Sequence, residues 1–113
     1  MKLFEALKKI RECERIQLPF LSSVIDFDII IEIGYAQELG RPLTIKQLYL
    51  LRISSPTTVR RKLARLIERG IVIRRKHASD QRTMVLTVST GSHRMLNKYG
   101  SALTEIISGL STK

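Results

Sequence analysis

The chain has 113 residues and a formal net charge of +10. Its length predicts a single domain over residues 1–113, because one hydrophobic core usually takes roughly 100–200 residues, and an apolar content of 43% excludes general disorder. Aromatic residues make up only 5% and Trp is absent, which argues against a stacking platform for single-stranded nucleic acid. A basic composition of this kind favours a polyanionic partner.

The sequence also lacks the marks of several other protein classes. A single cysteine, Cys13, cannot form an internal disulfide, which fits the cytoplasm; we interpret it as an inert thiol rather than a redox sensor. The chain has only two histidines, His77 and His93, beside this one cysteine, so no metal site is expected. The most apolar stretch, 24–33, contains three acids, so no membrane span is expected. Neither a phosphate-cradling motif nor a paired carboxylate is present, so we expect no enzyme and no cofactor.

The spacing of apolar residues predicts two helices in the first forty residues. Residues 2–16 form an amphipathic helix that ends before Pro19. A second helix begins after Ser22 or Ser23 and ends at Gly40. Because apolar residues occur nearly all around this second helix, we expect it at the centre of the core.

A helix-turn-helix is predicted next. A short helix over 44–51 begins with Thr44 and Gln47 in capping-box spacing. After a short link, Ser55 caps a second helix over 56–69. The arrangement is typical of proteins that insert the second helix into a DNA groove.

The helix over 56–69 has one apolar stripe and an opposite face that is small and polar at first and cationic further along. Such a face suits a DNA major groove, since Thr contacts base edges and Arg binds guanine or phosphate. The alternative is a basic, solvated helix in an ordinary helical domain. The candidate DNA contacts in this part of the chain are Lys46, Ser55, Thr57, Thr58, Arg60, Arg61 and Arg65.

Two short strands over 71–75 and 83–88 predict a hairpin, and a last helix over 91–109 completes the order α-α-α-α-β-β-α. The expected fold is therefore mainly α with a small β-hairpin, a winged helix-turn-helix. The wing, 74–83, would follow the DNA backbone or enter a minor groove, whose negative potential attracts Arg. Its candidate contacts are Arg74, Arg75, Lys76, His77, Ser79 and Arg82.

Asp80 lies two residues before Arg82 in the predicted turn. Its carboxylate can accept from Arg82 or from backbone N–H groups of the turn, and so orient the arginine. The alternative is an ordinary Asx-turn beside a surface arginine.

The positive charge is concentrated in one part of the chain. Residues 1–40 have a net charge of −2 and residues 41–113 one of +12, of which +7 falls within residues 60–82. The excess therefore coincides with the predicted recognition helix and wing, and it predicts one surface that binds duplex DNA.

The stretch over 43–91 resembles the winged-helix core of MarR-type transcriptional regulators, with weaker similarity over 22–40. The segments that carry the resemblance are Leu43–Leu48, Ser55–Arg61, Leu66–Arg75 and Asp80-Gln81-Arg82. The resemblance implies a regulator that binds specific double-stranded DNA sequences. It also implies Arg61 as the recognition-helix arginine, Arg82 as the wing-tip arginine and Asp80 as its orienting partner.

Helices 2–16 and 91–109 each have an apolar stripe beyond what a small winged-helix core needs. We expect both to form a homodimer interface, which would place two recognition helices about 34 Å apart. The alternative function is a winged-helix module that binds a protein or binds DNA without sequence preference. The sequence leaves open whether a small molecule acts as an effector.

Overall fold

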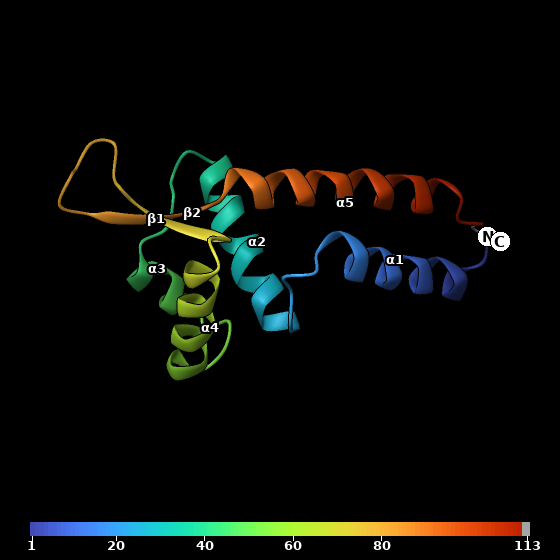
Figure 1. The fold of residues 1–113 in the computed structure, drawn as a ribbon, viewed down its shortest axis with the longest axis horizontal. Coiled ribbons are helices and arrows are strands. Elements are labelled where there is room, and N and C mark those ends of the chain that lie inside the picture. The colour runs from blue at the N-terminus through green and yellow to red at the C-terminus, as the bar shows by residue number, and fades with distance from the viewer. Residues whose placement is uncertain (112–113) are drawn as a thin grey trace. The chain divides into compact units, whose positions relative to one another are not determined.

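The computed structural model describes residues 1–111, and it confirms the expected class and order of elements (Figure 1). The elements are α1 (Leu3–Gln17), α2 (Val24–Glu38), α3 (Ile45–Leu50), α4 (Pro56–Glu68), β1 (Val72–Lys76), β2 (Met84–Val88) and α5 (Thr90–Ser108). Each predicted element is present, with its ends within two residues of the predicted ones. The chain divides into two compact units, one made of residues 1–21 together with the segment from Thr90 onward, and one of residues 22–89.

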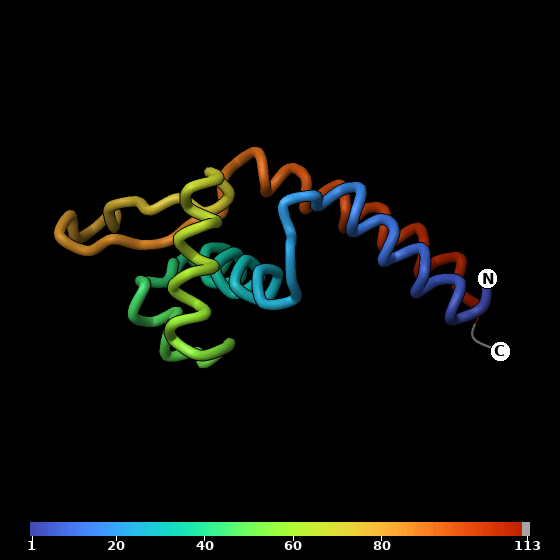
Figure 2. Tube along the Cα trace, turned by 60° about the horizontal axis from the view of Figure 1, so that its bottom comes forward, coloured from blue at the N-terminus to red at the C-terminus, as the bar shows by residue number. Residues whose placement is uncertain are grey.

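The first unit is a pair of helices. α1 and α5 run side by side in opposite directions in both views, so the start of α1 lies beside the end of α5 (Figures 1 and 2). Ala6 and Tyr99 are buried in this unit. Leu3, Phe4 and Leu7, which belong to the predicted apolar stripe of α1, are exposed instead. Two helices alone bury little apolar surface, so much of this stripe remains in contact with solvent.

The second unit is built around α2. Ile29, Ile30 and Ile33 are fully buried on one side of this helix, which confirms its place in the core. The expectation from a helix apolar nearly all round is wrong for the opposite side, where Ile31 and Tyr35 are exposed. The elements of this small unit are too few to cover both sides of α2.

Polar caps set where three of the helices begin. The Ser23 hydroxyl accepts a hydrogen bond from a backbone N–H of the first turn of α2. At α3, Thr44 and Gln47 form the predicted capping box, with bonds of 3.1 and 2.9 Å. Ser55 caps α4, with Pro56 in its first turn. These local bonds satisfy backbone donors that a helix start leaves free, which is why sequence spacing located the helix-turn-helix.

The wing is an antiparallel hairpin in which β1 pairs with β2 from Val72↔Val88 to Lys76↔Met84. Besides its pairing with β1, β2 is hydrogen-bonded to segments outside the wing. The Leu86 N–H donates to the Leu43 carbonyl over 2.8 Å. The Val88 N–H donates to the Gln37 side-chain oxygen over 2.9 Å. The base of the wing is therefore attached to α2 and to the segment that precedes α3.

Gly70 ends α4 with a φ of +73°, in the left-handed region. We expect Gly70→Ala to lower the free energy of unfolding by about 1–2 kcal/mol, because a Cβ disfavours this conformation. Gly34→Ala is the matched control within α2, where alanine is favoured and the nearest atom to a new Cβ, Val88 Cγ2, is at an ordinary 3.6 Å. Urea denaturation measures the free energy of unfolding of both variants. Equal values for Gly70→Ala and Gly34→Ala would contradict the left-handed conformation of Gly70.

Candidate nucleic-acid interface

α4 has one side in the core and one side in solvent. Val59, Leu63 and Leu66 are buried, so the predicted apolar stripe is confirmed. The opposite face is exposed, and with its flanks it carries small polar groups in the first turn and cations beyond them. The predicted contacts that are exposed on or next to this helix are Lys46, Ser55, Thr57, Arg60, Arg61 and Arg65, while Thr58 is half-buried.

The first turn of α4 uses two of the candidate hydroxyls for its own structure. The Ser55 Oγ accepts from the Thr58 N–H over 3.2 Å and donates to the Thr58 Oγ1 over 2.9 Å. Both side chains therefore serve first as the cap of the helix. Thr57, between them, is exposed and is the first-turn hydroxyl best placed to reach a ligand.

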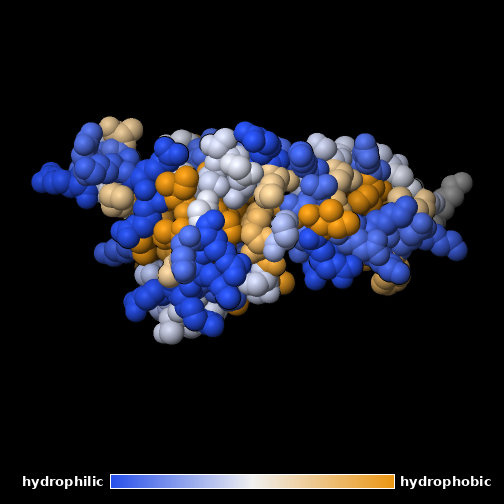
Figure 3. Space-filling model, viewed as in Figure 1, coloured by the Kyte–Doolittle hydropathy of each residue, from blue (hydrophilic) through white to orange (hydrophobic). Residues whose placement is uncertain are grey.

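Further along α4 the surface forms a shallow depression of about 400 Å³. It is lined by Arg61, Lys62, Ala64, Arg65 and Glu68. Three cations face one acid there, so the depression attracts an anionic group such as a phosphate. Figure 3 shows strongly hydrophilic residues over α4 and over the wing tip on this side of the molecule.

The strands of the wing present cations to solvent. Arg74, Arg75 and Lys76 are exposed along β1, and the Arg75 Nε donates to the Thr87 Oγ1 of β2 over 3.2 Å. His77 is half-buried, and its Nδ1 accepts from the Ser79 backbone N–H over 3.0 Å. The His77 ring therefore shapes the turn through this atom, whereas the Ser79 hydroxyl is exposed.

Asp80 makes the turn contacts that the sequence predicted, to both the backbone and Arg82. Its carboxylate accepts from the Arg82 N–H over 3.0 Å and from the Thr83 hydroxyl over 2.9 Å. The Arg82 Nε lies 3.8 Å from the Asp80 Oδ1, with the arginine side chain 96% exposed. The Arg82 N–H, the Thr83 hydroxyl and the charge of His77 lower the pKa of Asp80. Asp80 thus stays ionised and orders the turn that carries Arg82.

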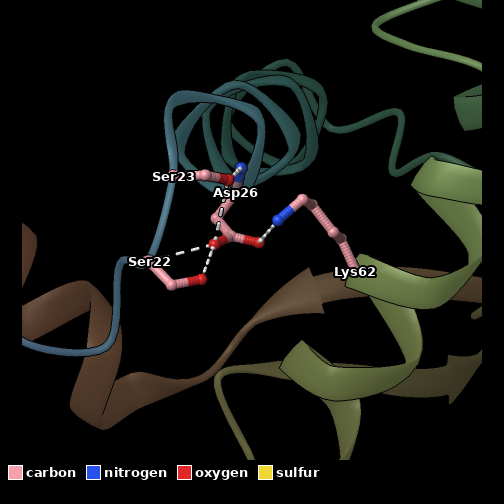
Figure 4. A network of polar contacts seen from close by, with 4 residues as sticks. All are labelled: Ser22, Ser23, Asp26 and Lys62. Atoms are coloured by element: carbon pink, nitrogen blue, oxygen red, sulfur yellow. Dashed lines mark hydrogen bonds and ion pairs between the residues drawn. The ribbon is translucent and has the colours of Figure 1, made fainter.

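One polar contact of α4 was not predicted. Asp26, in the first turn of α2, is buried, and its Oδ1 lies 3.8 Å from the Lys62 Nζ of α4 (Figure 4). Its Oδ2 accepts from the Ser22 N–H, the Ser22 hydroxyl and the Ser23 hydroxyl. The sequence showed only an acid next to two serines, and a lysine flanking an apolar stripe; nothing in it paired the two.

These contacts give Asp26 a defined response to pH. Burial raises its pKa, but the hydrogen bonds from Ser22 and Ser23 and the charge of Lys62 outweigh burial, so the pKa lies below its ordinary 3.8. The ionised carboxylate therefore stabilises the fold above about pH 4, and this contribution is lost as the pH falls through the lowered pKa.

We expect the stability difference between the wild type and Asp26→Asn to be largest near neutral pH and to shrink on acidification below about pH 4. Thermal melting across this range measures the difference. Asp28→Asn, at an exposed position of the same helix, is the control and should follow the wild type throughout. A constant difference for Asp26→Asn would show that the charge of Asp26 does not stabilise the fold.

Comparison with solved structures shows which fold this arrangement belongs to. MepR of S. aureus bound to ethidium bromide superposes with a TM-score of 0.72 and 18% identity, over 96% of this chain and 77% of that one. The transcriptional regulator Tm0710 of Thermotoga maritima gives 0.67 and 21%, over 93% and 69%. A mutant of E. coli MarR complexed with operator DNA gives 0.55 and 19%, over 94% and 76%. The chain has the MarR-type winged-helix fold. No protein-family model and no curated protein matches the sequence.

Within the MarR-type fold, α3 and α4 are the helix-turn-helix, and β1 and β2 with their turn are the wing. The two arginines singled out by sequence similarity, Arg61 and Arg82, both lie exposed in the same unit, on α4 and in the wing turn. Within residues 1–111 no helix is long and apolar enough to cross a membrane. The same residues contain no group of three or more His, Cys, Asp or Glu that could hold a metal ion.

Proposed function

We propose that the protein is a transcriptional regulator that binds specific double-stranded DNA sequences, with α4 in the major groove and the wing, 74–83, on the minor groove or backbone. The observation that carries the proposal is the face of α4: nothing in its unit covers it, and it changes from small and polar to cationic along the helix. Among the solved structures of this fold, a mutant of S. aureus MepR is bound to an oligodeoxyribonucleotide and a mutant of E. coli MarR is complexed with operator DNA.

The side chains of this surface divide by reach and charge. Thr57 and Arg61 lie on the outermost line of α4, where side chains meet base edges. Arg65 lies further along the same face and Arg60 on its flank, and with Lys46 they suit phosphate contacts, which set the position on the duplex. The exposed cations of the wing suit further phosphate contacts along the DNA backbone. Arg82, in the wing turn, suits a narrow minor groove.

The same proposal includes a homodimer formed through α1 and α5. Phe4 is 80% exposed and Ile16 75% exposed on α1, and Met95 and Ile107 are exposed on α5. A second copy would bury these side chains, and a two-fold axis would place two copies of α4 about 34 Å apart, one helical turn of DNA. We infer a cytoplasmic regulator rather than an enzyme, because Tm0710, which shares this fold, is a transcriptional regulator.

A binding titration tests whether DNA is the partner. We expect a random-sequence duplex of about 30 base pairs to bind at low salt, with affinity that falls steeply as salt rises, because phosphate contacts release counterions. Fluorescence anisotropy of a labelled duplex measures the affinity at each salt concentration. Absence of binding at about 50 mM salt would overturn the proposal and favour the alternative module that binds a protein partner.

We expect Phe4→Glu to shift the chain from dimer to monomer, because it places a charge within the proposed apolar interface. Sedimentation equilibrium at matched concentrations measures the mass. Gln81→Glu, which introduces the same charge at an exposed position of the wing outside α1 and α5, should leave the dimer intact. A monomeric wild type, or a Phe4→Glu variant that remains dimeric, would contradict this part of the proposal.

A further inference from the structure

The ion pair between Asp26 and Lys62 connects the start of α2 to the recognition helix, and it is more than a helix cap. Ser23 already caps α2 through the Asp26 N–H, so the helix start does not require a charged side chain at position 26. The Asp26 side chain is nevertheless 3% exposed and that of Lys62 17% exposed. Within residues 1–111 no hydrogen bond reaches the Asp26 Oδ1, which faces the lysine (Figure 4).

Burying two charges is costly, and an ion pair of this kind usually adds little net stability compared with apolar side chains of similar size. What the ion pair adds is a specific partner for each of the two charged groups. Val59, Leu63 and Leu66 hold α4 against the core through apolar contacts, which are not directional. The Asp26–Lys62 pair joins one atom of α2 to one atom of α4 over 3.8 Å, so a rotation of α4 about its axis would separate the two charges.

The helical geometry places Lys62 at the edge of the buried stripe, about 60° from Val59, and Arg61 on the opposite face. α4 carries four cationic side chains, and all of them except Lys62 are exposed. A rotation of about 20° would move a side chain at a radius of about 6 Å by about 2 Å. Base-edge hydrogen bonds tolerate far less than this, because a bidentate contact needs both donors in line.

We infer that the Asp26–Lys62 pair sets the rotation of α4, and through it the choice of DNA sequence. Asp26 and Lys62 are thus positioning residues that act through Arg61 and its neighbours. The inference rests on the proposed function.

Asp26→Asn distinguishes a positioning role from an effect of net charge on DNA binding, because the substitution makes the protein more positive. Charge alone would then tighten binding to every sequence. A positioning role weakens binding to the selected duplex while binding to random duplex stays the same or tightens. We expect the ratio of specific to non-specific affinity to fall about tenfold, while Asp28→Asn, with the same charge change on the exposed side of α2, keeps the wild-type ratio.

The double variant Asp26→Asn/Lys62→Met separates positioning from stability. It removes one acid and one base, so the net charge of +10 is unchanged, and it leaves no unpaired buried charge. We expect thermal stability near that of the wild type together with a ratio that stays about tenfold low. If Asp26→Asn does not fold, the double variant alone decides the question.

A wild-type ratio in the double variant, or equal ratios for Asp26→Asn and Asp28→Asn, would overturn the inference. Failure of the proposed function gives a different result, since the wild type itself would then show no preference for any duplex.

Discussion

Replacing Arg61 by alanine is expected to weaken binding to the selected duplex by about 1–3 kcal/mol and to relax the preference at one base pair. Arg61 is exposed on the face of α4 opposite the buried stripe, and its fork is the group of this surface best suited to guanine. Its loss should therefore weaken specific binding far more than binding to random duplex. Competition titrations at one fixed salt concentration measure both affinities.

Arg69→Ala is the matched control, because it removes the same charge from the exposed C-cap position of α4, which is not among the candidate contacts. We expect it to change both affinities slightly and by the same factor. An Arg61→Ala variant with unchanged affinity for the selected duplex would show that α4 does not read bases through this residue, whatever else binds the DNA.

The largest effect on stability is expected from Ile30→Ala. Ile30 is 1% exposed in the core of the second unit, and truncating such a side chain costs about 2–5 kcal/mol, through lost burial and the cavity left behind. Urea denaturation followed by circular dichroism measures the free energy of unfolding.

The next residue of α2 provides an internal control. Ile31 is 49% exposed, so Ile31→Ala should change the free energy of unfolding by well under 1 kcal/mol in the monomer. Equal losses for the two variants would mean that both sides of α2 are covered. That result would restore the expectation from the sequence alone and overturn the arrangement of α2 described above.

The parts of the fold that sequence reasoning located are those set by local interactions. Thr44 with Gln47, and Ser55 with Thr58, are contacts within four residues, so their spacing in the sequence indicates them directly. The same holds for Asp80 and the wing turn. The DNA contacts themselves stay predictions, because exposure and charge do not show what lies opposite them.

The parts that were missed depend on distant segments. Hydrophobicity alone placed all of α2 in the core, although which side is covered depends on how many elements pack against it. The pair formed by Asp26 and Lys62 joins residues 36 positions apart, and no periodicity within either helix indicates the other.

Selection of bound sequences from a random DNA pool, with the mass of the selected complex measured in the same preparation, tests the central claim most directly. The account predicts an enriched inverted repeat, with half-site centres about 10–10.5 base pairs apart, bound by two copies of the chain. A pool that shows no enrichment after repeated rounds would contradict sequence-specific recognition. A single half-site bound by one copy would contradict the dimer.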